Sequence, residues 1–185
     1  VTTDPADQCN PDIALAGNGI LHVVWQDHRR GNWDVYASTT SNGETLTRET
    51  LIADSDDNQT EPVIAADGRS PSRVYVAWQD DRSGNQDIFV ASSTNAFASM
   101  TTLAVTTNPA DQTSPDLAVD AANTAYLVWT DARNGQADIY GAASTTSWAN
   151  VPLVLGDGNQ SSPAVATAPG GSLLHMVWVT DISGH

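Results

Sequence analysis

The chain has 185 residues, of which 22 are acidic and only 7 are basic, so its formal net charge is −15. A charge of this size repels phosphate groups, and we therefore expect neither nucleic acid nor an anionic membrane surface as a partner. No apolar run approaches the roughly 20 residues that a transmembrane helix needs, so no membrane insertion is expected either.

One short phrase recurs four times along the chain: Asp or Asn, then Gln, two small or polar residues, and Pro. A Trp follows each copy, and the copies lie about 50 residues apart, a spacing typical of a repeat protein. A motif present in every unit builds the unit, so it predicts the fold better than the function. The four copies occupy residues 7–11, 58–62, 111–115 and 159–163, and the Trp residues are Trp25, Trp78, Trp129 and Trp178.

Within a unit, the apolar residues alternate in short runs bounded by Gly, Asn, Asp and Pro, which is typical of β-strands. In the second unit we expect strands at 62–66, 74–79, 87–92 and 102–105. Four antiparallel strands in about 50 residues form the blade of a β-propeller. We therefore predict an all-β chain that forms a single propeller array over 1–185. Its units are complete blades at 8–58, 59–111 and 112–159, a partial blade at 160–185, and the tail of a preceding blade at 1–7.

After each of the first three Trp residues, the sequence Asp-x-Arg-x-Gly-x-x-Asp recurs with identical offsets. We interpret it as the hairpin loop between the second and third strands, in which Gly supplies a positive φ angle. We expect the Arg to pair with one or both Asp residues and so to fix the hairpin, while the Trp residues pack between blades. The three sets are Asp27, Arg29 and Asp34; Asp80, Arg82 and Asp87; and Asp131, Arg133 and Asp138.

The longer phrase Trp-x-Asp-x-Arg-x-Gly-x-x-Asp-Ile-Tyr, which ends on Ile139-Tyr140 in the third unit, resembles the repeat of TolB-type, WD40-like β-propellers. The resemblance covers nearly the whole chain as repeats. The Ser-Pro-Asp-Gly turn of that family is kept only in part, at Asp67-Gly68. The resemblance implies a propeller that serves as a scaffold or binding module.

The outer units are incomplete. The fourth unit reaches His185 after two expected strands, and residues 1–8 repeat residues 105–112 in seven of eight positions, so 1–3 matches the end of a fourth strand. Three arrangements follow: a longer array, a pair of chains that together form seven blades, or an imperfect four-bladed ring. Open blade edges carry unpaired backbone groups, so we expect self-association there, with a second copy of the chain or with another protein partner.

Two aromatic residues break the repeat and are candidates for ligand contact, Trp33 and Trp148. Both could stack on a sugar ring, which makes a glycan a candidate partner. The acidic residues Asp54, Asp56 and Asp57 resemble a calcium-binding cluster but lack the spacing and the terminal Glu of a twelve-residue calcium loop. We interpret them as a solvated loop and expect no cofactor. Calcium is the one ion that we keep as a candidate ligand.

Signatures of known propeller enzymes are missing from the sequence. It has neither the Ser-x-Asp-x-Gly-x-Thr-Trp boxes and Tyr-Glu pair of sialidase-like enzymes nor a Gly-x-Ser-x-Gly elbow, so we predict that these residues are not an enzyme. Abundant Thr, Ser, Asn and Ala without Lys favour an extracellular, cell-surface or periplasmic location. The predicted function is a non-catalytic scaffold or protein-binding propeller. The alternatives are a multivalent, lectin-like carbohydrate-binding propeller and a fragment of a propeller glycoside hydrolase.

Overall fold

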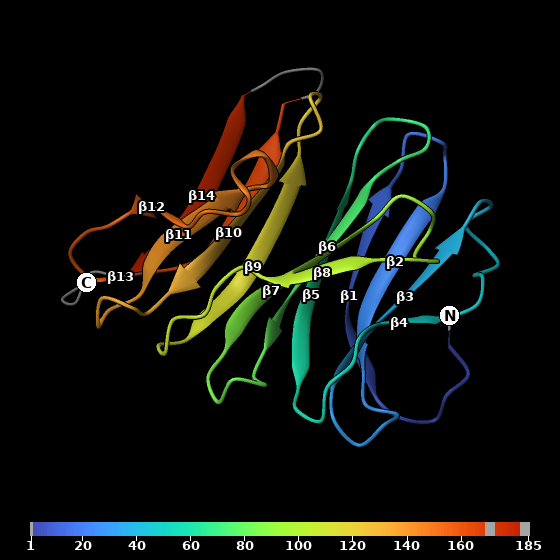
Figure 1. Ribbon diagram of the computed structural model, residues 1–185, viewed down its shortest axis with the longest axis horizontal. Helices are drawn as coiled ribbons and strands as arrows, with labels where there is room; N and C mark the ends of the chain where they lie inside the picture. The colour runs from blue at the N-terminus through green and yellow to red at the C-terminus, as the bar shows by residue number, and fades with distance from the viewer. Residues whose placement is uncertain (1, 169–172, 182–185) are drawn as a thin grey trace.

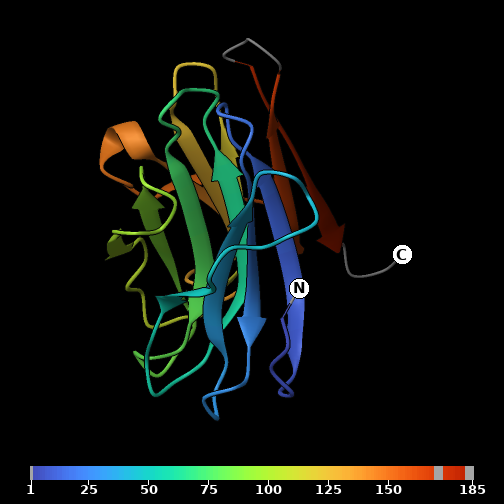
Figure 2. The same ribbon diagram turned by 90° about the vertical axis from the view of Figure 1, so that its right-hand side faces the viewer.

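The computed structural model describes residues 2–168 and 173–181. In these ranges the chain forms three four-stranded antiparallel sheets and one two-stranded sheet, which follow one another as the blades of a β-propeller (Figure 1). Seen from the side, the sheets lie one behind another (Figure 2). The predicted fold class, an all-β propeller with four-stranded blades, is confirmed. Val1 and the residues 169–172 and 182–185 of the fourth unit lie outside the described residues.

Each complete blade is a meander in which consecutive strands pair. The strands end where alternating apolar residues give way to Gly, Asn and Asp, which favour turns. No helix of the described residues is long and apolar enough to cross a membrane. Blade 1 consists of β1 (Gln8–Leu15), β2 (Leu21–Asp27), β3 (Asp34–Thr40) and β4 (Thr50–Ala53); blade 2 of β5 (Gln59–Ala66), β6 (Val74–Asp80), β7 (Asp87–Ser93) and β8 (Thr101–Ala104); blade 3 of β9 (Gln112–Val119), β10 (Ala125–Asp131), β11 (Asp138–Ala143), the 3-10 turn η1 (Ser144–Thr146) and β12 (Val151–Val154); and blade 4 of β13 (Asn159–Thr167) and β14 (Leu174–Asp181).

The hydrophobic core lies between neighbouring blades. Val24 of blade 1 belongs to the same buried cluster as Val76 and Trp78 of blade 2. A second cluster joins Ile88 of blade 2 to Trp129 of blade 3. Each sheet therefore buries apolar side chains against the sheet beside it, which is how layered β-proteins exclude water.

The blades are joined by backbone hydrogen bonds at the start of each first strand. The repeated Gln donates its backbone N–H to a carbonyl in the hairpin of the preceding blade, and the Asn or Asp before that Gln accepts an N–H from the same hairpin. The repeated phrase therefore connects blades as well as starting them. The Gln bonds are Gln59 to Trp33 (2.6 Å), Gln112 to Gln86 (2.7 Å) and Gln160 to Ala137 (2.8 Å), and the return bonds to Asn58, Asp111 and Asn159 are each 3.1 Å.

Trp178 departs from the expectation that all four repeated Trp residues are buried or half-buried. It is 41 % exposed, whereas Trp25, Trp78 and Trp129 are at most 3 % exposed. Trp25 is buried although no blade of the described residues precedes blade 1. A preceding blade is therefore not what buries the repeated Trp. In blades 1 to 3 the third strand brings an aromatic ring against the indole, and within the described range β14 has no third strand beside it.

The row of blades does not close on itself. Blades 1 and 4 lie at opposite ends of the row (Figure 1), and Ile13 on β1 and Val177 on β14 are 59 % and 67 % exposed. The four-bladed ring is therefore not the arrangement that the described residues form. Residues 2–7, expected as part of the tail of a preceding blade, contain no strand.

Candidate functional site

Each complete blade holds a polar cluster at the end of its second strand. In blade 2, Nε1 of Trp78 donates to Oδ2 of Asp80 at 2.9 Å, while Arg82 donates from Nε to Oδ1 at 2.7 Å and from Nη2 to Oδ2 at 2.6 Å. The Arg82 guanidinium also lies over the aromatic ring of the third strand. The buried carboxylate thus has its partners within its own hairpin. The same arrangement surrounds Asp27 with Trp25 and Arg29, and Asp131 with Trp129 and Arg133.

The second Asp of each hairpin lies outside this cluster and fastens the loop in a different way in each blade. None of the three accepts a hydrogen bond from the repeated Arg of its own hairpin, within the described residues. The repeated Arg and the first Asp of each hairpin are therefore paired within the motif, which supports a structural role. Oδ2 of Asp34 is buried without a hydrogen bond and has only the ion pair with Arg30. The partners are Arg30 for Asp34, Ser83 and Thr106 for Asp87, and Asn134 for Asp138.

The two Trp residues proposed as ligand contacts do not share a site. Trp33 lies in the hairpin of blade 1, half-buried, with its ring 5.0 Å from that of His28. Trp148 lies in the loop after η1, at the other end of the strands, with its ring 6.0 Å from that of Tyr75 in blade 2. The two indoles therefore cannot contact one ligand together.

The acidic residues Asp54, Asp56 and Asp57 are exposed, and Asp54 pairs with Arg30 at 2.8 Å. In residues 2–168 and 173–181, no three His, Cys, Asp or Glu side chains are grouped as a metal ion would require. Calcium therefore stays a prediction from the sequence, with no site assigned to it.

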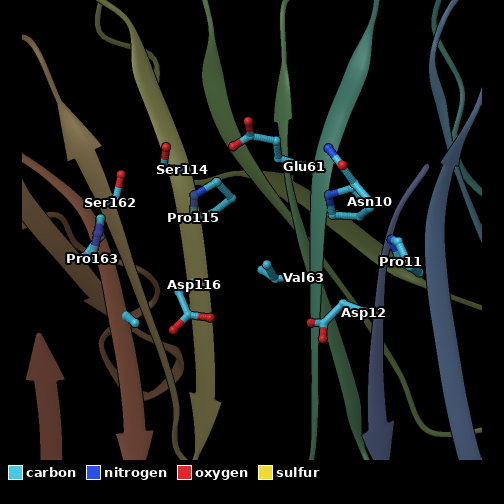
Figure 3. A pocket seen from close by; sticks show the side chains of 12 residues that line it. Asn10, Pro11, Asp12, Glu61, Val63, Ser114, Pro115, Asp116, Ser162 and Pro163 are labelled. Atoms are coloured by element: carbon cyan, nitrogen blue, oxygen red, sulfur yellow. The ribbon is translucent and has the colours of Figure 1, made fainter. Parts of the chain in front are cut away.

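A cavity of about 430 Å³ opens where the first strands of the four blades converge. Each of these strands contributes three consecutive residues to its lining, 10–12, 61–63, 114–116 and 162–164. Its volume lies within the range of small-molecule sites. Of its lining residues, the ionisable ones are Asp12, Glu61 and Asp116, and Figure 3 shows both Asp residues one level below Glu61.

A strained backbone position recurs among the residues that line this cavity. The residue before each repeated Pro has a positive φ angle of 49° to 52°, which side-chain-bearing residues rarely adopt. The backbone N–H of Glu61 donates to Gln26 Oε1 of the preceding blade at 3.0 Å, and that of Ser114 to Gln79 Oε1 at 2.6 Å. The strands are irregular in pairing at these points, and such bulges re-aim side chains. The four positions are Asn10, Glu61, Ser114 and Ser162.

Asp12 and Asp116 occupy equivalent positions, immediately after the Pro of blades 1 and 3. Each carboxylate accepts a backbone N–H from the next blade: Asp12 from Ile64 at 2.8 Å, and Asp116 from Val165 at 2.6 Å. Burial raises the pKa of the Asp116 carboxyl; backbone N–H groups oppose the change, and the negative charge of Asp12 adds to it. Asp116 is therefore the carboxyl of this cavity that holds a proton more readily than an ordinary Asp.

Sequence reasoning singled out neither Asp12 nor Asp116, although a signal for them was present. Alignment of the four units at the repeated Pro places Asp12, Val63, Asp116 and Ala164 in one column. Residues that differ between otherwise similar units are candidates for function, because the structure of the blade does not require them. The search for repeated residues pointed instead to the hairpins.

The sequence matches no family model and no curated protein in the comparisons. Solved structures are similar to the chain. A protein of unknown function from Dyadobacter fermentans has a TM-score of 0.73 at 11 % identity, covering 93 % of this chain and 49 % of its own, so the chain spans about half of its length. A family 117 glycoside hydrolase from Zobellia galactanivorans has a TM-score of 0.58 at 11 % identity, covering 94 % and 66 %. An endo-arabinase from Bacteroides thetaiotaomicron has a TM-score of 0.56 at 11 % identity, covering 92 % and 74 %.

These likenesses show a β-propeller fold, and they correct the prediction that the chain is not an enzyme. The prediction depended on two arguments: the sequence lacks sialidase-type motifs, and the search for a site was directed at the repeated motif, which builds the blades. Glycoside hydrolases with this fold are among the similar structures, so neither argument separates this chain from an enzyme. The TolB-type assignment is narrower than the propeller fold that these structures support.

Proposed function

We propose that the chain is part of a carbohydrate-active β-propeller that cleaves glycosidic bonds in the cavity at the convergence of its first strands. The observation that carries the proposal is the pair Asp12 and Asp116, two carboxyl groups that occur in only two of the four units and line one cavity with the exposed Glu61. Glycoside hydrolysis needs two carboxyl groups, one to give a proton and one to act as base or nucleophile. The similar glycoside hydrolases support the same reaction class.

The environment of Asp116 suits the proton donor. Its raised pKa favours the protonated form, which can deliver a proton to the oxygen of the departing sugar. Asp12 then supplies the second carboxylate, which deprotonates the attacking water or attacks the anomeric carbon. The exposed Glu61 lies where the sugar would enter and can accept hydrogen bonds from its hydroxyl groups.

The test is a hydrolysis assay on a panel of polysaccharides that includes arabinan. The release of reducing sugar ends measures the rate. Asp116→Asn and Asp12→Asn should each lower the rate by about 10²-fold or more, because general acid or base catalysis is worth that much. Asp56→Asn, in an exposed loop, is the matched control and should keep the parental rate. A parental chain that cleaves no member of the panel, or Asn variants with full activity, would contradict the proposal.

A glycan that is bound without being cleaved would instead support the lectin-like alternative. The extracellular or periplasmic location belongs to the same proposal, since polysaccharide substrates lie outside the cell membrane. A purely scaffolding role predicts instead that the two carboxylates only join neighbouring blades through their hydrogen bonds to Ile64 and Val165. The Asn variants would then lose stability, and the parental chain would have no hydrolytic activity.

A further inference from the structure

A second cavity, of about 410 Å³, lies between blades 2 and 3 at the end of the strands opposite the hairpins. The turn between β5 and β6 forms one side of it and the turn between β9 and β10 another, and both turns lie at the upper end of Figure 1. The loop after η1 completes the lining with Trp148. This cavity shares no residue with the one that holds Asp12 and Asp116.

Positive charge is concentrated in this second cavity, although the chain as a whole is strongly acidic. Arg69 and Arg73 both line it, and neither forms an ion pair with the described residues. The remaining Arg residues, Arg48 apart, pair with carboxylates in or near the hairpins. Two of the seven basic residues of the chain therefore face one cavity with their guanidinium groups uncommitted to a carboxylate.

One acidic residue, Asp67, also lines the cavity, but its carboxylate is engaged by its own turn. Its Oδ1 accepts the backbone N–H groups of Arg69 at 3.3 Å and Arg73 at 2.9 Å. With the amide of Asn123 turned so that its nitrogen donates to Asp67 Oδ2 at 3.2 Å, its oxygen accepts from the Arg69 guanidinium. Asp67 thus fixes the backbone of both arginines, and Asn123 contacts the side chain of Arg69, whereas the Arg73 guanidinium has no hydrogen-bond partner among the described residues.

The equivalent place between blades 1 and 2 shows what is special about this cavity. There, Ala96 and Phe97 both have positive φ angles, and the Phe97 ring packs on that of His22. Phe97 is only 4 % exposed. Trp148 follows Ser147 with the same pair of angles and packs on Tyr75, but it stays half-exposed. No Arg occurs in the turn of blade 1 at 16–20. The repeat thus supplies the loop, and the substitutions at this joint supply a larger aromatic face and two guanidinium groups.

We propose that this cavity binds an acidic sugar, with its carboxylate on Arg73 and Arg69 and its ring on the exposed face of Trp148. A planar guanidinium matches the two oxygens of a carboxylate, and an indole offers an apolar face to a sugar ring. Ser92, Ser144 and Asn123 line the same cavity and can bond to hydroxyl groups. The choice of a sugar depends on the proposed function, to which this site adds a substrate class, acidic polysaccharides.

The net charge of the chain limits the ligand further. A long, densely charged polyanion would be repelled by the −15 net charge, whereas a short segment feels mainly the two arginines within a screening length of about 8 Å. The site is therefore suited to a short or sparsely charged acidic oligosaccharide. Its affinity should fall as the salt concentration rises.

The test is calorimetric titration of the chain with trigalacturonate, with the fully methyl-esterified trisaccharide as the uncharged probe. Trigalacturonate should bind and the ester should not. Arg73→Gln, which removes the positive charge but keeps a polar side chain, should weaken binding by about 10- to 100-fold, the value of a charge-assisted hydrogen bond. Arg48→Gln removes an Arg outside the cavity and should leave binding unchanged. Equal binding of acid and ester, no binding of either, or an Arg73→Gln variant with parental affinity would overturn the proposal.

Variants of the two cavities separate this site from the other one. Asp116→Asn should lower the rate of hydrolysis and leave trigalacturonate binding unchanged, whereas Arg73→Gln should weaken trigalacturonate binding. Trp148→Phe keeps an aromatic ring and should weaken binding less than Trp148→Ala, with near-ultraviolet circular dichroism to show that both variants are folded. Loss of trigalacturonate binding in Asp116→Asn would place the acidic ligand in the catalytic cavity instead and contradict the second site.

Discussion

Blades 2 and 4 carry the same Trp in the same strand, yet the two indoles have different surroundings. Trp78 is fully buried and hydrogen-bonded to Asp80, whereas Trp178 is 41 % exposed and donates to the hydroxyl of Thr180 at 3.0 Å. Blade 2 has a third strand whose Phe89 stacks on the indole, and an Arg that lies over Phe89, and the described part of blade 4 has neither. The comparison shows that the Trp motif alone does not bury the indole, which in blades 1 to 3 also has the third strand and its aromatic ring beside it.

The largest expected effect is on the free energy of unfolding when each Trp is removed. Trp78→Ala should lower it by about 3 to 5 kcal/mol, because it leaves a large cavity in a packed core. Trp178→Ala should lower it by about 1 kcal/mol or less, as for a partly exposed residue. Urea unfolding followed by circular dichroism measures both, and equal losses in the two variants would contradict the comparison.

The next effect concerns the partner of each indole. Asp80→Ala leaves the buried N–H of Trp78 without its acceptor and the Arg82 guanidinium without its carboxylate, so we expect a loss of about 2 to 3 kcal/mol. The Arg82 side chain is 37 % exposed, and water can replace part of its bond, which keeps the loss moderate. Thr180→Ala, the matched change in blade 4, should cost less than about 1 kcal/mol.

The open faces of the outer blades sharpen the comparison in a different way. Ile13 on blade 1 is 59 % exposed, although its equivalent in blade 2, Ile64, is 5 % exposed because blade 1 covers it. Free apolar faces favour association, so we expect the chain to form dimers or larger assemblies in light scattering. Val177→Asp, which places a charge on the open face of blade 4, should shift the assemblies toward monomers. A parental chain that stays monomeric at high concentration would contradict this prediction.

The smallest effect is the response of the first hairpin to acid. Burial alone would raise the pKa of Asp27, but hydrogen bonds from Arg29 and Trp25 outweigh it and lower the pKa below its usual value. An acid with a lowered pKa in the folded state stabilises the fold above its unfolded pKa of about 3.9 and loses that contribution as the pH falls through the folded value. The parental chain should therefore lose stability below about pH 4 more steeply than Asp27→Asn, as thermal unfolding across pH 2 to 7 would show.

The sequence predicts the blades well because strands and hairpins depend on nearby residues. From Trp78 to Asp87, ten positions contain the end of strand β6, a Gly with a positive φ angle and the start of strand β7. All three can be predicted from neighbouring residues in the sequence. The exposure of Trp178 could not be predicted in this way. It depends on whether a third strand, which follows the Trp later in the sequence of blades 1 to 3, lies beside the second strand. The cavities were missed for the same reason: Asp12 and Asp116 are about a hundred residues apart and meet only because the blades curve around a common axis.

The joints between blades have a consequence for how such a chain can evolve. Gln59, Gln112 and Gln160 each bond through the backbone N–H to a backbone carbonyl of the preceding hairpin, whose side chains are Trp, Gln and Ala in turn. A joint made by main-chain atoms accepts almost any side chain at the acceptor position, so lineages can diverge there without losing the geometry. Side chains at these acceptor positions can therefore form contacts of their own, as Trp33 does with the ring of His28.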